Sequence, residues 1–226
     1  MKVCIYHISE IYLYEYYVYR NEYEINEHDL VTDYCNSAIA EMNKGNIDLA
    51  LQEYLKAHMQ NPVKYDLYSK IIMCCRQLND LDGFYNYTLE SHKFCCTRAE
   101  LASYYRNLGY FCLEKYKPQL ALDLYTYSKC FYENKNADNE IEYLKAAMGD
   151  KIKENSIEEI QENLLHEKIP IMADNITMGL LFRAGEEAES KGILTQALDC
   201  YEMVYDLTND EELSHKIKLL KSKLEG

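Results

Sequence analysis

The sequence has few of the residues that interrupt helices. Its 226 residues include three prolines, eight glycines and no tryptophan, whereas 23 are tyrosine. Proline removes a backbone hydrogen-bond donor and glycine weakens a helix interior, so a chain poor in both favours helix over most of its length. The composition therefore predicts an all-α protein, long enough to bury a substantial core.

Long apolar runs are absent. No stretch approaches the roughly 18 apolar residues of a transmembrane helix. The first twenty residues are interrupted by His7, Glu10 and Glu15, and no small-residue cleavage site of a secretory signal follows them. We therefore expect a cytoplasmic protein that does not act on a membrane.

Basic clusters are absent as well. The net charge is −14 at pH 7, and no group of lysines and arginines predicts a locally basic face. An acidic surface repels the phosphates of a nucleic acid, so general nucleic-acid binding is disfavoured. A protein or peptide partner, with a basic segment as the simpler choice, is the expectation.

Catalytic motifs are missing too. The chain contains no glycine-rich phosphate loop, no G-x-S-x-G nucleophile turn and no H-E-x-x-H zinc motif. We therefore expect no enzyme, no catalytic residue and no cofactor.

The nine cysteines, an odd number, fall mostly within helical patterns. Two adjacent pairs, Cys74-Cys75 and Cys95-Cys96, suggest a metal or redox site, and His92 lies one helical turn before Cys96. Neighbouring residues of a helix point about 100° apart, so adjacent cysteines chelate a metal poorly. Packing of reduced thiols in the core is the preferred interpretation, without a metal, while a redox role for the pairs stays open.

One spacing of small and aromatic residues recurs along the chain. In GNIDLALQEYLKA, residues 45–57, a glycine is followed by Ala50, Tyr54 and Ala57, which share one helical face. Small residues on either side of a large one let two helices approach closely, with the ring filling the gap. Two further copies are Tyr116, Ala121, Tyr125 and Ser128, and Gly192, Ala197, Tyr201 and Val204. The helical segments before the three copies carry small residues at Ser37 and Ala38, at Gly109 and Cys112, and at Ala184, Gly185 and Ala188.

These positions resemble the tetratricopeptide repeat, a helix–turn–helix unit of about 34 residues. The three clear copies lie slightly more than two units apart, so a degenerate copy fits between each pair. The first covers roughly residues 65–96, with a turn at residues 78–81 and with Phe84, Thr88 and Ser91 in the small–large–small positions. The second covers roughly residues 136–168.

The resemblance implies a right-handed α-solenoid of antiparallel helix pairs, with about five repeats and a C-terminal capping helix. Residues 1–30 would pack on the first repeat as a helix pair or a hairpin. Residues 31–168 would hold repeats 1–4, of which the second and fourth are degenerate, and residues 169–226 the final repeat and the cap.

Helix-breaking and helix-capping residues support these boundaries. Pro170 within HEKIPIMADN, residues 166–175, breaks a helix and predicts a joint between two sub-arrays. The tetrapeptides TRAE, SIEE and TNDE, which begin at Thr97, Ser156 and Thr208, predict capping boxes at helix starts. The capping helix would bury Leu213, Ile217, Leu220 and Leu224 on one face.

The resemblance also implies that the first helix of each pair lines a concave groove that binds a partner. By matching positions, the candidate partner-binding residues are Asn43, Arg76, Gln77, Arg106, Tyr110, Glu114, Phe182 and Glu186. Arg76 and Arg106 could pair with carboxylates, and Tyr110 offers a rigid amphipathic contact. We therefore expect a non-enzymatic scaffold for proteins or peptides. The Lys and Asn clamp that some of these repeats use for terminal carboxylates is not matched, because Cys35 and Ile39 occupy its positions in the first unit.

Two other classes of function stay open. The tyrosine-rich first 25 residues could pair with a second copy, which would make the chain a structural or oligomerisation module and a homodimer. The chain could instead be a peptide-sensing regulator, but it has no basic recognition helix of its own and would act through a partner protein.

Overall fold

The computed structural model of the chain describes residues 30–60 and 65–225, so the predicted N-terminal segment falls outside the described residues except for Leu30. The described residues form eleven α-helices, two short 3-10 turns and no strand, which confirms the all-α prediction. The helices are α2 (Leu30–Asn43), α3 (Ile47–His58), α4 (Tyr65–Gln77), α5 (Leu81–Ser91), α6 (Arg98–Glu114), α7 (Pro118–Phe131), α8 (Lys135–Met148), α9 (Ile157–His166), α10 (Asn175–Ser190), α11 (Leu194–Thr208) and α12 (Glu211–Glu225). The turns are η1 (His92–Phe94) and η2 (Gly149–Lys151).

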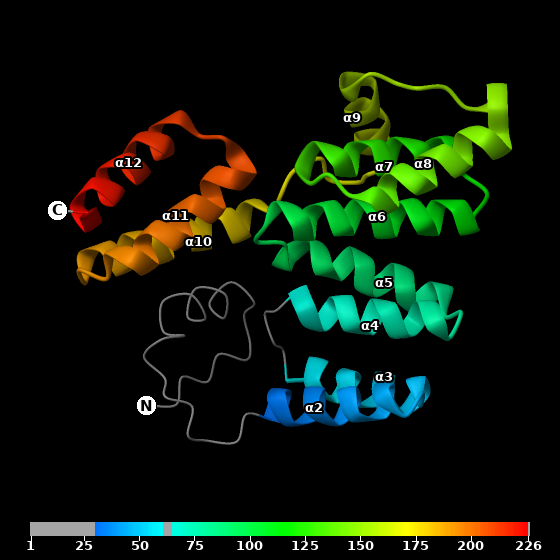
Figure 1. Cartoon of the computed structure of the whole chain (residues 1–226), viewed down its shortest axis with the longest axis horizontal. Helices are drawn as coiled ribbons and strands as arrows, with labels where there is room; N and C mark the ends of the chain where they lie inside the picture. The colour runs from blue at the N-terminus through cyan, green and yellow to red at the C-terminus, as the bar shows by residue number, and fades with distance from the viewer. Residues whose placement is uncertain (1–29, 61–64, 226) are drawn as a thin grey trace.

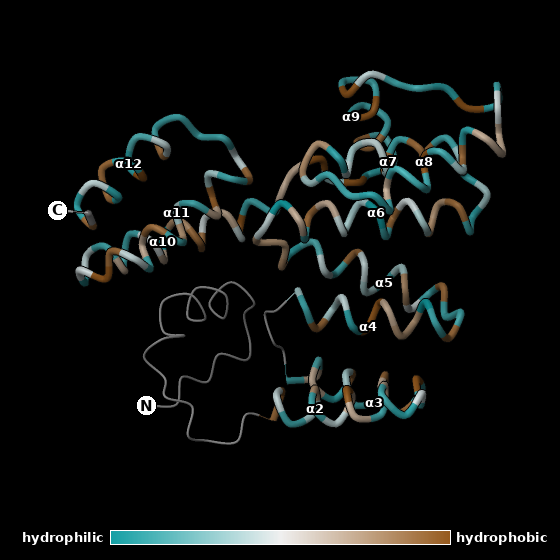
Figure 2. The backbone as a smooth tube through the Cα atoms, viewed as in Figure 1, coloured by the Kyte–Doolittle hydropathy of each residue, from teal (hydrophilic) through white to brown (hydrophobic). Residues whose placement is uncertain are grey.

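Helices that follow one another in the chain pack as pairs, and the pairs are stacked. The pairs α2–α3, α4–α5, α6–α7 and α10–α11 are joined by tight turns, and each of the first two pairs also contacts the helix that follows it. Figure 1 shows α2 to α7 lying side by side, while α10 to α12 stand to one side of this stack. Figure 2 shows hydrophobic and hydrophilic residues alternating along each helix, as expected where every helix buries one face.

The four tight turns share one backbone conformation. In each turn one residue has a positive φ: 80° at Gly45, 57° at Asn79, 57° at Tyr116 and 75° at Gly192. The next residue donates its N–H to the carbonyl five positions back, as Lys117 does to Cys112 at 2.8 Å and Ile193 to Ala188 at 2.9 Å. Glycine adopts this conformation without strain, and asparagine tolerates it. The repeated turn confirms the predicted equivalence of Tyr116 to the two glycines and the predicted turn at residues 78–81.

The small and aromatic residues pack as the spacing predicts. Ala50, Ala121 and Ala197 are each fully buried. A Cβ atom on Gly109 would lie 3.0 Å from the ring of Tyr125, and one on Gly185 would lie 2.6 Å from the ring of Tyr201. In the degenerate pair α4–α5, the residues at the equivalent positions are also buried: Phe84, Thr88 and Ser91.

Helix starts and the C-terminal helix agree with the sequence except at one cap and one leucine. Thr97 and Ser156 form complete capping boxes with Glu100 and Glu159. The prediction that Thr208 caps the start of α12 was wrong. The Asp210 carboxylate is the cap, and it accepts hydrogen bonds from the backbone N–H groups of residues 212 and 213, at 2.9 and 3.2 Å. Asp210 directly precedes α12, so its carboxylate reaches these donors, whereas the Thr208 hydroxyl donates to the carbonyl of Val204 within α11.

The hydrophobic face of α12 packs against α11, as a capping helix should. Leu213, Ile217 and Leu220 are buried, but Leu224 is 42% exposed. The prediction that Leu224 shares the buried face was therefore wrong, because contact with α11 does not extend to the last turn of α12.

Helix α9 packs mainly against α7 rather than against α8, which precedes it. The buried carboxylate of Asp123, on α7, helps to hold it there. This carboxylate accepts hydrogen bonds from the side-chain amides of Gln119, Asn155 and Asn163, at 3.0, 2.9 and 3.0 Å. Helices α8 and α9 thus differ from the other pairs of consecutive helices, because a polar network joins α9 to α7.

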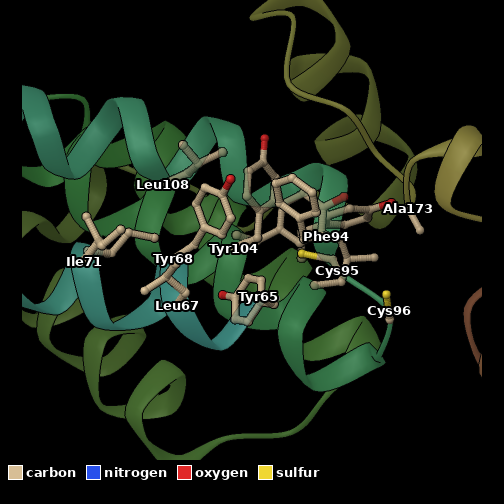
Figure 3. Close-up of a cluster of buried hydrophobic side chains, with 14 of the residues drawn as sticks. Tyr65, Leu67, Tyr68, Ile71, Phe94, Cys95, Cys96, Tyr104, Leu108 and Ala173 are labelled. Atoms are coloured by element: carbon tan, nitrogen blue, oxygen red, sulfur yellow. The ribbon is translucent and has the colours of Figure 1, made fainter. Parts of the chain in front are cut away.

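The connection between α9 and α10, residues 167–174, lies within the predicted joint of residues 166–175, and we call it the strap. It lies across the buried aromatic cluster of α6 and α7. Three successive strap carbonyls accept hydrogen bonds from side chains of the stack. Tyr105 donates to Pro170 at 2.9 Å, Tyr127 to Ile171 at 2.5 Å and His92 to Met172 at 2.9 Å. Figure 3 shows Ala173 of the strap at the edge of this cluster, on the side of Phe94.

Arg98 adds a second link between the stack and the C-terminal helices. Its guanidinium group donates to the carbonyls of Cys130 and Phe131, which end α7, at 2.5 and 2.7 Å. It also donates to the carbonyl of Asp206, near the end of α11, at 3.0 Å. Free carbonyls at helix ends carry partial negative charge, so one cation holds two helix ends together.

Two glycines of α10 provide a test of the close helix approach. We expect Gly185→Ala to lower the free energy of unfolding by about 1–3 kcal/mol, because the new Cβ atom would overlap the ring of Tyr201. A Cβ atom on Gly179, in the same helix, would have no neighbour within 4 Å, so Gly179→Ala should raise the free energy of unfolding by about 0.5–1 kcal/mol. Urea unfolding measures both. Equal effects of the two substitutions would contradict the packing.

His92 should make the stability depend on pH. Burial lowers the pKa of its imidazole, and the hydrogen bond to Met172 and the charge of Asp174 offset part of this effect. The unfolded side chain has a pKa of about 6.5, so the stability that neutral His92 contributes is complete above that pH and is lost as the pH falls towards the lower folded-state value.

The variant His92→Gln keeps a hydrogen-bond donor but does not titrate. We therefore expect the wild-type free energy of unfolding to fall more steeply than that of the variant between pH 7 and pH 5. Unfolding in urea at several pH values measures the difference, which isolates His92 because the other titrating groups are the same. A difference that does not change with pH would show that the imidazole is not buried in its neutral form.

Candidate interaction surface

Two neighbouring first helices, α4 and α6, bring candidate residues together on one exposed surface. We define the α4–α6 face as Met73, Arg76, Arg106 and Tyr110. The guanidinium carbon of Arg76 lies 4.1 Å from the centre of the Tyr110 ring. The ring of Phe84 meets the Tyr110 ring edge-on, with centres 5.2 Å apart. Tyr110 is therefore held in place by α5 while its ring contacts a cation.

The positions of Arg76 and Met73 follow from the pattern of α4. Ile72 and Cys75 face the core and are buried, which leaves residues 73 and 76 on the other side. Arg76 also lies in the last turn, where the negative end of the helix dipole favours a cation. Met73 is 36% exposed, so an apolar side chain lies on the same surface.

Arg106 lies one turn before Tyr110 and is only partly exposed. Its Nη1 atom is buried and has no hydrogen-bond partner. Burial lowers the pKa of the guanidinium group, and the phenol groups of Tyr65 and Tyr132 act in the opposite direction.

Neither arginine pairs with an acidic side chain of the part of the chain that the structure describes. This matters because the chain has 38 acidic residues against 24 lysines and arginines. A carboxylate from a partner would therefore compete with no internal ion pair at these two positions.

Three more predicted residues lie near the same ends of the first helices. Asn43, Gln77 and Glu114 are the last residues of α2, α4 and α6, and all three are exposed. Figure 1 shows these helix ends on the same side of the stack. Gln77 directly follows Arg76 and Glu114 lies one turn after Tyr110, so these two residues border the α4–α6 face.

Phe182 and Glu186 lie elsewhere. They belong to α10, which packs mainly against α11. The Phe182 ring contacts the Tyr201 ring at 5.5 Å, and the Nζ atom of Lys216, from α12, lies 5.5 Å from its centre. Phe182 thus takes part in the packing of the last three helices, and the structure does not bring it to the α4–α6 face.

The sequence did not point to Phe84 or Tyr65 as part of this surface. Phe84 was expected only as a packing residue, yet it also orients Tyr110. Tyr65 begins α4, and its hydroxyl is buried without a hydrogen-bond partner. The position of Tyr65 at the start of a first helix was the available signal, but nothing in a single sequence shows which neighbouring helix it faces.

Six of the eight described cysteines are buried, and these include both adjacent pairs, Cys74-Cys75 and Cys95-Cys96, as the core-packing interpretation predicts. Cys130 is exposed and Cys35 is partly exposed. Burial raises the pKa of the Cys75 thiol to about 12, which disfavours the reactive thiolate. Within residues 30–60 and 65–225, no three or more His, Cys, Asp or Glu side chains are grouped so that they could hold a metal ion.

Comparison with protein-family models and with curated proteins gives no match for this chain. The fold is that of an all-α protein built from stacked helix pairs. No described helix combines the length and the hydrophobicity that crossing a membrane requires. Inference about function therefore depends on the geometry of the exposed surfaces.

A substitution separates a surface role of Arg76 from a structural one. We expect Arg76→Ala to lower the free energy of unfolding by no more than about 1 kcal/mol, because exposed cation–ring contacts contribute about 0.5–1 kcal/mol. Leu108→Ala, on the buried side of α6, should lower it by about 2–5 kcal/mol. Chemical unfolding compares them, and similar losses would mean that Arg76 serves the fold.

Proposed function

We propose that this chain is a non-enzymatic, cytoplasmic scaffold that binds a peptide segment or a protein through the first helices of a tetratricopeptide-like array. In this proposal the array is a right-handed superhelix of about five repeats with α12 as its cap, and α2, α4 and α6 line its concave groove. The observation that carries the proposal is the exposed Arg76 guanidinium on the Tyr110 ring, at 4.1 Å, with Met73 beside it.

The chemistry of this surface supports binding. Tyrosine and arginine are the residues that most often dominate binding energy at protein interfaces, and methionine adapts to irregular partners. These side chains stand on helices whose buried faces are fully packed, so little conformational entropy is lost when a partner binds. A segment laid across α4 and α6 would contact an aromatic ring, a cation and an apolar side chain at once.

The charge of the chain favours a partner that is basic over most of its length. A net charge of −14 attracts basic segments at long range and accelerates their association, and salt should weaken this effect. Arg76 and Arg106 would repel a uniformly basic segment locally, so the partner should carry apolar or acidic groups where it meets them.

Selection of displayed random dodecapeptides on the full chain tests the proposal. We expect enriched peptides to bind the wild type and to lose roughly tenfold or more in affinity with the double variant Arg76→Ala, Tyr110→Ala. The matched control is Leu89→Ala, Lys93→Ala, which removes an exposed apolar side chain and an exposed cation from α5 and η1. Binding should survive in this control.

Two outcomes would contradict the proposal. One is that no peptide is enriched over an unrelated helical protein. The other is that enriched peptides bind the Arg76→Ala, Tyr110→Ala variant as well as they bind the wild type. Circular dichroism of both double variants checks that the helices remain folded.

A further inference from the structure

Arg106 is a cation that the fold has left incomplete. Its Nη1 amino group is excluded from water but donates no hydrogen bond. A buried N–H group without an acceptor destabilises the folded state, and the effect is larger when the group is charged. Among the described residues, Arg106 has no ion pair with an acidic side chain.

A second incomplete donor belongs to α4. Tyr65 is 7% exposed, and its hydroxyl group makes no hydrogen bond of normal geometry. Burial raises the pKa of Tyr65 well above the usual value, Cys95 and Glu100 act in the same direction, and the Ser103 side chain and the charge of Arg106 oppose them. Tyr65 and Arg106 stand on α4 and α6, whose side chains meet where the guanidinium carbon of Arg76 lies 4.1 Å from the centre of the Tyr110 ring.

The two donors come from the two helices of the proposed binding surface. Tyr65 begins α4, and Arg106 lies one turn before Tyr110 in α6. Since Arg106 is itself only partly buried, rotation about its flexible side-chain bonds can bring Nη1 to a ligand.

We propose that Arg106 and Tyr65 form a subsite for a single side-chain carboxylate, from a glutamate or aspartate of the bound peptide. This inference rests on the proposed function and specifies what one position of the partner must be. One carboxylate oxygen would accept from Nη1 of Arg106 and the other from the Tyr65 hydroxyl group.

The kind and number of donors favour a carboxylate over other acceptors. A carboxylate offers two oxygens and one negative charge, and the subsite offers two kinds of donor and one positive charge. A doubly charged phosphate would need a second cation. Arg76 is engaged by the Tyr110 ring at 4.1 Å, so it is not free to supply that charge without leaving the ring.

Three pools of acetylated dodecapeptides test the subsite on the full chain. All pools share the same lysine and aromatic content. The first has one internal glutamate and an amidated C-terminus, the second has glutamine in place of that glutamate, and the third has the glutamine and a free C-terminal carboxylate. Fluorescence anisotropy measures the affinity of each pool and of its best members.

We expect the glutamate pool to bind at least about tenfold more tightly than the glutamine pool, and Arg106→Gln to remove this difference. Equal binding of the first two pools would overturn the subsite and leave the proposed function intact. Preferential binding of the third pool would overturn it as well, because the ligand would be a chain terminus. Failure of every pool to bind would instead contradict the proposed function, and the subsite with it.

The variant Arg106→Met provides a readout that a structural arginine would not give. It removes the unsatisfied N–H groups but keeps the aliphatic length, so its midpoint of urea unfolding should rise while the preference for glutamate disappears. A lower midpoint would overturn the proposal, because it would show that the guanidinium group stabilises the free protein. Arg76→Gln is the matched control, and it should keep the preference for glutamate even where overall affinity falls.

Discussion

The structure depends on one contact, the face of a tyrosine ring against a glycine of the paired helix. A Cβ atom on Gly185 would overlap the Tyr201 ring at 2.6 Å, and one on Gly109 would make a tight contact with the Tyr125 ring at 3.0 Å. This distance sets how closely the two helices of a pair approach, and hence which residues of the first helix remain on the outer side. Ala121 and Ala197, one turn before these tyrosines, are fully buried for the same reason. The exposed surfaces of α4 and α6 are thus a consequence of packing on their opposite sides.

Local pattern made this part of the fold predictable from the sequence. The contact between a small residue and a ring requires fixed offsets within a helix, and the tight turn requires a positive φ at one position, so both leave a periodic trace. Even the degenerate pair α4–α5 could be placed, because Asn79 is one of the few residues other than glycine that tolerate that turn. Repetition turned several weak local signals into one strong signal.

Contacts between distant segments left no such trace. The carbonyls of the strap are held by Tyr105, Tyr127 and His92, which are 44 to 80 residues away from their acceptors. Backbone carbonyls accept from any donor, so the strap residues themselves carry no signature of this contact. Asp123 is a similar case, since a carboxylate in a helix is usually exposed, and only the fold brings three amide groups around it. The two arginines could be assigned to a face, but their surroundings could not be predicted.

The charges of this protein act over two different distances. The net charge of −14 sets a field that is screened beyond about 8–10 Å at physiological salt. At shorter range, a partner at the α4–α6 face would meet Arg76 and Arg106, which form no ion pair with a carboxylate of the described residues, together with the phenol of Tyr110. A basic segment is therefore attracted from a distance, whereas the contact itself favours an acidic or aromatic side chain within that segment. An unsatisfied guanidinium group lowers the stability of the free protein, and its retention in an acidic chain is understandable if a partner supplies the missing acceptor.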